Sequence, residues 1–416
     1  MVSKLKIVEF GKLPGEWDVF KLGECSNIYR GGSPRPIQDY ITNADNGVNW
    51  IKIGDVRAGE KYITSTEEKI KPEGIAMSRE VKIGDFILSN SMSFGRPYIL
   101  RIDGCIHDGW LVIQNYQSKY NAEYLYYLLS SEFVASQYKK LAAGSGVQNL
   151  NKDIVTEVML PHPEKKEQIA IASTLSSMDE LINTLEKEVI KKRNIKYGTL
   201  QKLITGKTRL SDFSDEWIPI NMAKKSKLKA RIGWQGLTTA EYLDSGYSYL
   251  VTGTDFVDGH INWDECHYVS ADRYYQDLNI QLSNGDVLIT KDGTIGKVAL
   301  VDKLTKPATL NSGVFVVRPI NHAYSARFLY YVLESRVFRD FLDMLSAGST
   351  IVHLYQKDLV NFSFMAPKTI EEQDAIADII YDLDCEVRKL EEKIRKYKKI
   401  KQGMMNDLLT GNIRLV

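Results

Sequence analysis

The sequence contains two copies of one domain-sized segment, and this internal repeat constrains the fold more than any other feature. Glu16–Trp17 recurs as Glu216–Trp217, and Leu203–Gly206 recurs as Leu408–Gly411 near the end of the chain. The offset between matching motifs grows in one direction, from 200 to 205 residues, as small loop insertions would produce. A period of this size indicates duplication of a whole domain and not a short solenoid repeat.

Further motifs recur in the same order, so the repeat covers nearly all of the 416 residues. A chance similarity would scatter the matches, whereas these keep one order and one drifting offset. The further pairs are Gly84–Ser89 with Gly285–Thr290, Ile106–Gly109 with Leu310–Gly313, Leu125–Leu129 with Leu329–Leu333, Ala143–Ser145 with Ala347–Ser349, and Glu167–Gln168 with Glu372–Gln373.

Each copy has a globular part of about 160 residues followed by a long helix. Short runs such as Phe86–Leu88 and Val314–Val317 are separated by Gly, Asn, Ser and Pro, which predicts strands joined by turns. Asn121 and Ser325 are good N-caps for one continuous helix of about 20 residues in each copy. We expect an α+β protein, with two pseudo-symmetric α/β domains separated by a long antiparallel two-helix coiled coil. The expected boundaries are 1–163, 164–206, 207–366 and 367–416.

The last part of each copy predicts a helix of roughly 55 Å. Between Glu167 and Ile204 there is no Pro and a single Gly, Gly198; between Glu371 and Leu409 there is again no Pro and a single Gly, Gly403. Both segments follow a proline and end at Thr-Gly, which suits the start and the C-terminal cap of a helix.

Apolar residues in both helices step by three and four positions, which is the pattern of a coiled-coil seam. In the first helix this pattern becomes polar at Lys192 and Lys196 before it resumes at Leu200. Pairing of the two helices would bury both stripes; the alternatives are packing of each helix on its own domain, or dimerisation of two chains. The expected seam is Leu175, Met178, Ile182, Leu185, Val189, Ile380, Leu383, Val387, Leu390, Ile394 and Tyr397.

The bulk composition is that of an ordinary globular chain, with 44% hydrophobic residues and a net charge of +1. Because phosphate neutralisation requires clustered Lys and Arg, charge alone does not indicate DNA binding. No run of about 18 apolar residues occurs, so we expect a cytoplasmic protein without a membrane partner. The four cysteines are far apart and form no Cys-x-x-Cys pair, which argues against a disulfide frame or a zinc site.

No sequence motif for catalysis or nucleotide binding is convincing. The Gly-Lys-Thr at 206–208 resembles the end of a P-loop, but the glycine required five positions earlier is Gln201. His260 and His267 flank Cys266 without further ligands at metal spacing. The chain has no Pro-Pro, so it lacks the Asn/Asp-Pro-Pro-aromatic tetrapeptide of adenine methyltransferases. We therefore expect no enzyme activity, no metal and no cofactor in this chain.

Several of these stretches together carry a family resemblance. They are Leu13–Trp17, Gly84–Ser89, Gly285–Thr290 with Gly293–Gly296 after it, Glu167–Ala172 and Leu203–Leu210. Their order, their double occurrence and their coverage resemble the specificity subunits of type I restriction-modification enzymes. Two places depart from the pattern: Asn90–Gly95 differs from the more usual Lys291–Gly296, and Gln148 has no glutamine counterpart in Thr350–Leu354. A role of Gln148 therefore cannot be carried over to the second copy.

The resemblance implies a target-recognition domain in each copy, reading one half of a bipartite, asymmetric site in double-stranded DNA. It implies that the paired helices set the length of the spacer between the half-sites and dock two methyltransferase subunits. Those subunits would carry S-adenosylmethionine and methylate adenine, and a restriction and translocase subunit that uses ATP would join them to cut unmodified DNA. The chain itself would be a non-catalytic recognition subunit.

Polar loops that contain glycine are the expected places of DNA contact, because Arg, Lys and Asn pair with base edges and phosphates. The alternative is that such loops only close hairpins. A divergent fused DNA methyltransferase, or a coiled-coil scaffold that binds only proteins, would be the competing functions. The candidate residues are Arg30, Ser33, Asn90, Ser91, Ser93 and Arg96 in the first copy, and Lys291, Asp292, Thr294 and Lys297 in the second.

Overall fold

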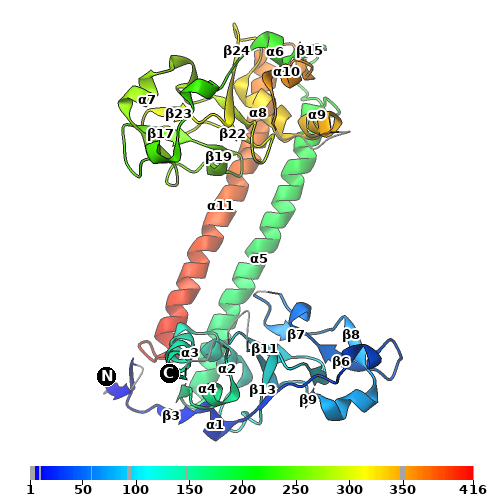
Figure 1. The fold of residues 1–416 in the computed structure, drawn as a ribbon, viewed down its shortest axis with the longest axis vertical. Helices are drawn as coiled ribbons and strands as arrows, with labels where there is room; N and C mark the ends of the chain where they lie inside the picture. The colour runs from blue at the N-terminus through cyan, green and yellow to red at the C-terminus, as the bar shows by residue number, and fades with distance from the viewer. Residues whose placement is uncertain are drawn as a thin grey trace. The chain divides into compact units, whose positions relative to one another are not determined.

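The computed structural model describes residues 5–8, 11–57, 59–90, 95–145, 149–346 and 353–415. The chain forms two compact units, the first built from two stretches of chain and the second from one (Figure 1). Unit 1 comprises Met1–Glu186 and Glu392–Val416, and unit 2 comprises Lys187–Glu391. Each long helix therefore begins in the unit of its own repeat and ends in the other unit.

Unit 1 contains two five-stranded sheets whose shared core lies between them. In the central strand, Phe86 and Leu88 face one hydrophobic core while Ile87 faces another, as the two-residue period of a strand requires. The first sheet has the order β4 (Asn27–Arg30), β13 (Trp110–Gln114), β10 (Phe86–Ser89), β11 (Pro97–Leu100) and β7 (Tyr62–Ile63). The second has the order β5 (Ile41–Thr42), β8 (Glu68–Ile70), β6 (Val48–Ile51), β12 (Gly104–Ile106) and β9 (Arg79–Val81).

Three helices cover the other face of the first sheet and gather around the start of the long helix α5 (Figure 1). They are α2 (Ala122–Leu129), α3 (Glu132–Ser145) and α4 (Lys152–Thr156). The predicted cap is present, since the Asn121 side chain accepts a hydrogen bond from the Tyr124 N–H at 3.1 Å. The prediction of one continuous helix after it was wrong. The Ser131 hydroxyl accepts from the Val134 N–H at 3.3 Å and so starts α3 as a new helix.

Unit 2 repeats this plan with fewer strands. The first sheet has the order β16 (Ser226–Lys229), β24 (Val314–Pro319), β21 (Val287–Thr290) and β22 (Val298–Leu300). The second has the order β20 (His267–Val269), β17 (Ser248–Val251) and β23 (Ala308–Leu310). A hairpin of β18 (Phe256–Val257) and β19 (His260–Ile261) accompanies them. The helices are α8 (Ala326–Glu334), α9 (Arg336–Ser346) and α10 (Gln356–Leu359), and Ser335 separates α8 from α9 as Ser131 separates α2 from α3.

Both units close in the same way, by pairing an early strand with the last strand before the long helix. In unit 1, β3 (Asp18–Lys21) pairs antiparallel with β14 (Met159–His162). In unit 2, β15 (Trp217–Asn221) pairs antiparallel with β25 (Ser363–Pro367). The duplication and the two similar α/β domains are thus confirmed at the level of topology. The remaining strands and α-helices are β1 (Leu5–Val8), β2 (Gly11–Pro14), α1 (Leu22–Cys25), α6 (Met222–Lys225) and α7 (Ala271–Tyr275).

Two helices of 40 residues each, α5 (Lys165–Ile204) and α11 (Ile370–Leu409), run through the units. Within unit 1 they pair antiparallel, because Asp179 contacts Lys401 at 2.5 Å and Glu186 contacts Lys398 at 2.7 Å. Within unit 2 the same antiparallel order appears in other ion pairs, such as Lys192 with Glu386 at 2.6 Å. The expected antiparallel helix pair is present in both units.

The expected seam residues face inward to different degrees. Seven of the eleven are buried and the other four are half-buried. The polar interruption has a direct explanation, because Lys192 and Lys196 form ion pairs with carboxylates of α11. The buried seven are Leu175, Ile182, Leu185, Val189, Ile380, Val387 and Ile394; the half-buried four are Met178, Leu383, Leu390 and Tyr397.

Candidate nucleic-acid interface

In unit 1, three of the predicted residues converge on Asp108, in the loop between β12 and β13. The Arg30 Nε donates to the Asp108 carbonyl oxygen at 3.2 Å, and the Asn90 Nδ2 donates to the same oxygen at 2.9 Å. The Ser33 hydroxyl donates to Asp108 Oδ1 at 3.0 Å. Asn90 is only 9% exposed, so its amide holds the loop in this structure instead of facing solvent.

Asp108 is the negative centre of a largely positive surface. The hydrogen bond from Ser33 is the main reason that the pKa of Asp108 is lowered, so this carboxylate stays ionised at neutral pH. Arg35, which is 82% exposed, lies 3.7 Å from it. Within the described ranges, no carboxylate forms an ion pair with Arg30. Lysines elsewhere in the unit do form ion pairs, such as Lys52 with Glu68 and Lys82 with Glu80. Exposed cations that outnumber the carboxylate beside them suit contact with a polyanion.

Tyr29 extends this basic surface. Its ring lies under the Arg79 guanidinium, 4.8 Å from the ring centroid, and Lys152 approaches the same ring at 5.8 Å. Arg79 and Lys152 are exposed, and in the part of the chain that the structure describes neither forms an ion pair with a carboxylate. The sequence reading missed Arg35, Arg79 and Asp108, because they become neighbours only when β4, β9 and the β12–β13 loop assemble.

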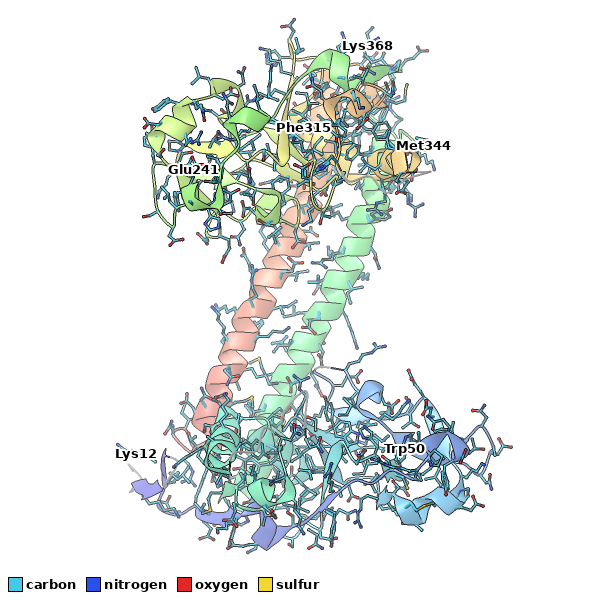
Figure 2. The ribbon with its side chains drawn as sticks, viewed as in Figure 1. Lys12, Trp50, Glu241, Phe315, Met344 and Lys368 are labelled. Atoms are coloured by element: carbon cyan, nitrogen blue, oxygen red, sulfur yellow. The ribbon has the colours of Figure 1, made fainter. Side chains whose placement is uncertain are left out.

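An open groove of about 750 Å³ adjoins Asp108. Trp50, labelled in Figure 2, and His107 contribute to its lining together with Arg35. The His107 Nδ1 accepts from the Gly109 N–H at 2.8 Å, and its Nε2 lies 3.2 Å from the Ile53 N–H. Burial lowers the pKa of His107, so the ring is held neutral at physiological pH.

The other predicted residues of unit 1 lie apart from Asp108 or outside the described ranges. Arg96 is exposed at the start of β11 and lines a separate cavity of about 350 Å³ with Tyr126 and Tyr138. Ser91 and Ser93 fall outside the described residues, as does Gln148.

Unit 2 carries the same backbone frame with a different side chain. The Lys291 N–H donates to the Gly313 carbonyl at 2.9 Å, and the Lys291 carbonyl accepts from the Leu354 N–H at 2.8 Å. Asn90 makes the equivalent bonds, from its N–H to Gly109 at 3.1 Å and from the Leu150 N–H at 2.9 Å. Asn90 and Lys291 therefore occupy the same position in the two domains.

The side chains around Lys291 form a second polar group. Lys291 Nζ lies 5.7 Å from the ring centroid of Phe315, which is labelled in Figure 2. The adjacent Asp292 Oδ1 contacts His353 Nδ1 at 2.6 Å. His353 was missed in the sequence because it follows residues 350–352, whose pattern departs from the first copy.

Thr294 and Lys297 belong to the tight turn between β21 and β22. The Thr290 hydroxyl donates to the Thr294 carbonyl at 2.5 Å and accepts from the Lys297 N–H at 2.9 Å. The backbone of these residues thus closes a hairpin, while the Lys297 side chain is exposed and lines a cavity of about 690 Å³ that also contains Arg339.

A buried carboxylate organises the start of α5 in unit 1. Glu167, 1% exposed, accepts from the Trp17 indole N–H at 3.0 Å and from Arg414 Nε and Nη2 at 2.5 and 2.8 Å. Arg414 follows α11, so the end of the second repeat completes the first. We call these three residues the first Trp–Glu–Arg cluster.

The second Trp–Glu–Arg cluster is its reciprocal copy in unit 2. Glu372 is fully buried and accepts from Arg209 Nε at 2.9 Å, from Arg209 Nη2 at 3.0 Å and from the Trp217 indole at 3.4 Å. Arg209 follows α5, so here the end of the first repeat completes the second. The two clusters explain why Glu-Trp, Glu-Gln and Thr-Gly-Lys/Asn-x-Arg-Leu motifs occur in both copies.

The described residues show neither a metal centre nor a membrane span. Among them, no three His, Cys, Asp or Glu side chains are grouped as metal ligands would be. None of the helices described has the length and apolar character to cross a lipid bilayer. The cysteines Cys25, Cys105, Cys266 and Cys385 are free thiols.

The fold and its loop edges define a duplicated two-domain protein with a long helix pair and, in each domain, a polar edge suited to a polyanion. A model of the type I restriction modification DNA specificity domain matches residues 14–193 and 242–402. The chain belongs to this family, and its role is to supply DNA sequence specificity in a type I restriction-modification system.

Known relatives agree over almost the full length. The type I restriction enzyme MjaVIII specificity subunit of Methanocaldococcus jannaschii is 23% identical, over 97% of this chain and 94% of the relative. The putative MjaX specificity subunit of the same organism is 24% identical, over 99% and 97%. The crystal structure of the type I restriction-modification S subunit from M. genitalium has a TM-score of 0.58 at 16% identity, covering 98% and 99%. A structure described for complex assembly and conformational transition of a type I R-M system has a TM-score of 0.59 at 18% identity, covering 96% and 99%.

Proposed function

We propose that this chain reads a bipartite, asymmetric site in double-stranded DNA, with one domain on each half-site. The supporting observation is that one backbone frame carries different side chains in the two domains. Asn90 stands where the other domain has Lys291, and Asp108 stands where it has Ser312. The Asn90 amide is bonded to the Asp108 carbonyl, whereas Lys291 is only half-buried, so two similar domains of this kind would present different groups to DNA and select different sequences.

The long helices are proposed to dock two methyltransferase subunits and to set the spacer between the half-sites. Several large apolar side chains remain exposed on them, including Ile190 at 60% and Ile195 at 43% on α5. Ile379 and Ile400 of α11 are each 38% exposed. Exposed apolar residues that recur along a helix pair are typical of a protein interface.

The chemistry is proposed to reside in the partners, in the cytoplasm, where the host DNA lies. S-adenosylmethionine would bind the methyltransferase subunits and ATP the restriction and translocase subunit, while this chain binds no cofactor and catalyses nothing itself. Support comes from membership of a family of specificity domains and from the absence of a catalytic motif in the sequence.

Reconstitution with the cognate methyltransferase tests this function. We expect labelled S-adenosylmethionine to modify adenines in a two-part motif only when both proteins are present. Exchange of Lys291→Asn should change the second half-site and leave the first intact, whereas Lys139→Asn, at a side chain 72% exposed on α3, should change neither. Methyl transfer by the chain alone would favour an enzyme, and an absent DNA footprint with the methyltransferase would favour a protein scaffold.

A further inference from the structure

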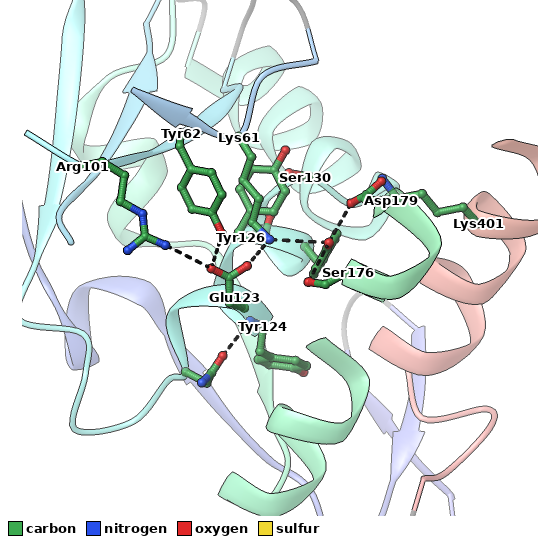
Figure 3. Close-up of polar contacts among 12 residues, drawn as sticks. Lys61, Tyr62, Arg101, Glu123, Tyr124, Tyr126, Ser130, Ser176, Asp179 and Lys401 are labelled. Carbon is green, nitrogen blue, oxygen red and sulfur yellow. Dashed lines mark hydrogen bonds and ion pairs between the residues drawn. The ribbon is translucent and has the colours of Figure 1, made fainter. Parts of the chain in front are cut away.

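A hydrogen-bonded contact at the junction between the globular part and the helix pair occurs in unit 1 (Figure 3). The Tyr127 hydroxyl of α2 donates to Asp179 Oδ2 of α5 at 2.7 Å. Asp179 Oδ1 in turn contacts Lys401 Nζ of α11 at 2.5 Å. One short chain of polar groups thus connects the domain to both long helices. We call it the first Tyr–Asp–Lys junction.

Unit 2 contains the same junction with the roles of the helices exchanged. The Tyr331 hydroxyl of α8 donates to Asp384 Oδ2 of α11 at 3.1 Å, and Asp384 Oδ1 contacts Lys196 Nζ of α5 at 2.5 Å. Lys196 also lies 3.5 Å from Glu334 at the end of α8. The junction is therefore a feature that both units share.

The tyrosines of both junctions are sheltered from water, which strengthens directional polar contacts, while Asp179 and Lys401 are 31% and 24% exposed. Tyr127 is 1% exposed and Tyr331 is 2% exposed. Burial raises the pKa of both hydroxyls, with Asp179 and Asp384 adding to the effect, so both remain donors at physiological pH. Desolvation alone would lower the pKa of Lys196, but its two carboxylate partners outweigh it, and the ammonium group stays charged.

Tyr127 is held from the domain side as well as from the helix side. Lys61 Nζ lies 4.4 Å from the Tyr127 ring centroid and 4.6 Å from that of Tyr126. Lys61 is itself paired with Glu123 of α2, which also accepts from the Tyr62 hydroxyl at 2.6 Å. Lys61 thus braces the Tyr127 ring while the hydroxyl reaches Asp179. Figure 3 labels Lys61 and Glu123 on the domain side and Asp179 and Lys401 on the long helices.

The apolar packing between the domain and its helix does not fix an angle to the same degree. Leu175 and Ile171 of α5 belong to the same hydrophobic core as α2. Burial of such side chains is non-directional, so it tolerates small rotations. A hydrogen bond to a carboxylate weakens steeply when its geometry changes. A rotation of the domain on its helices would therefore strain the junction, together with the hydrogen bond from the Asn121 N–H to Gln168 at the start of α5 at 2.7 Å.

We propose that the two Tyr–Asp–Lys junctions are positioning contacts that fix the angle of each reading domain on its part of the helix pair, and so determine how strictly spacer length is selected. This inference rests on the proposed function. A site with one base pair too many or too few can be read only if a domain rotates, and rotation breaks its junction. A variant that lacks the junction no longer meets this barrier.

The test uses the reconstituted modification complex and duplexes with both half-sites and spacers of native length, one base pair shorter, or one longer. The measured quantity is the initial methylation rate at each wrong spacer divided by that at the native spacer. Tyr127→Phe and Tyr331→Phe remove only the hydroxyl. We expect each to raise this ratio about five-fold, the factor for one net hydrogen bond, with the half-site bases unchanged.

Two matched variants separate positioning from general loosening of the fold. Tyr62→Phe loses the bond to Glu123 inside domain 1, and Tyr324→Phe loses the contact of its hydroxyl with Ser226 at 2.5 Å inside domain 2. Neither bond reaches α5 or α11, so both variants should keep the wild-type ratio. Lys401→Met breaks the ion pair while leaving Tyr127 in place, and it should raise the ratio if Tyr127→Phe fails to fold.

The outcomes are distinct. A wild-type spacer ratio in Tyr127→Phe, Tyr331→Phe and Lys401→Met would overturn the inference, and so would an equal rise in Tyr62→Phe. A wild-type complex that methylates without any two-part motif would instead refute the proposed function. An increase confined to the junction variants, with unchanged half-sites, is the expected result.

Discussion

Removal of Arg414 should destabilise unit 1 strongly although the residue lies two positions from the end of the chain. In the wild type, Glu167 is 1% exposed and receives three N–H donors, two of them from Arg414 at 2.5 and 2.8 Å. In Arg414→Met, the carboxylate keeps only the Trp17 indole N–H. Loss of one partner of a buried ion pair costs about 3–5 kcal/mol, because the other charge stays buried.

The lower end of that range applies, since Arg414 itself is 26% exposed and water screens part of the interaction. We therefore expect a loss of about 3 kcal/mol. For a unit of about 200 residues, each kcal/mol lowers the Tm by about 2–4 °C, which predicts a shift of about 6–12 °C. Differential scanning calorimetry of the purified chain, with Trp fluorescence as a second probe, measures it.

The double variant Arg414→Met with Glu167→Gln gives a sharper criterion. Because it removes the buried charge together with its partner, it should be more stable than Arg414→Met alone. Lys139→Met is the matched control: Lys139 and its partner Glu132 are 72% and 65% exposed, so its effect should stay within about 0.5 kcal/mol. If Arg414→Met shifts the Tm no more than Lys139→Met, or if the double variant is the least stable, the reasoning is refuted.

Three further predictions concern the domains. Burial lowers the pKa of His107 from 6.5, so on acidification the unfolded chain binds this proton at a higher pH than the folded chain. The free energy of unfolding should therefore hold its full value above about pH 6.5 and fall below it, and His107→Gln should make that fall shallower in pH-dependent melts. Gly293→Ala and Gly296→Ala both place a side chain at positive φ, but only at Gly296 would the added carbon lie 2.3 Å from Leu342. The free energy of unfolding should therefore fall about 1 kcal/mol more in Gly296→Ala than in Gly293→Ala, which is measured as a lower Tm. Arg30→Ala should weaken DNA binding by the complex at all sequences and reduce the slope of log affinity against log salt by about 1; an unchanged slope would remove Arg30 from the interface.

The fold was predictable because the sequence contains each element twice, so a pattern in one copy could be compared with its counterpart in the other. The long helices follow from the absence of proline and from apolar spacing, both of which are local. The break between α2 and α3 was not predicted, because the apolar spacing continues through Ser131, whose hydroxyl caps α3 by accepting the Val134 N–H. A cap of this kind becomes visible when the turn has formed.

The candidate interface was predictable only in its location. Glycine and polar residues marked the loops, and Arg30, Ser33 and Asn90 do come together. Their common partner, Asp108, lies 78 positions from Arg30 in the chain, and no local pattern encodes such a contact. The polar interruption of the seam is similar, because Lys192 looks unfavourable there until Glu386 is placed opposite it.

The reciprocal Trp–Glu–Arg clusters bear on how the protein is made. The core around Trp17 includes Met405, Leu408 and Leu409, and its charge balance depends on Arg414, so the first domain to leave the ribosome is completed by a residue 247 positions after Glu167. At about 5–20 residues per second, roughly 10–50 s pass between translation of α5 and of the end of α11. During that time the apolar face of α5 has no helix from its own chain to cover it. A message cut short between α10 and α11 would therefore give a chain with both reading loops present but without the segment that covers the core around Trp17, and chaperones or proteases would act on such a chain.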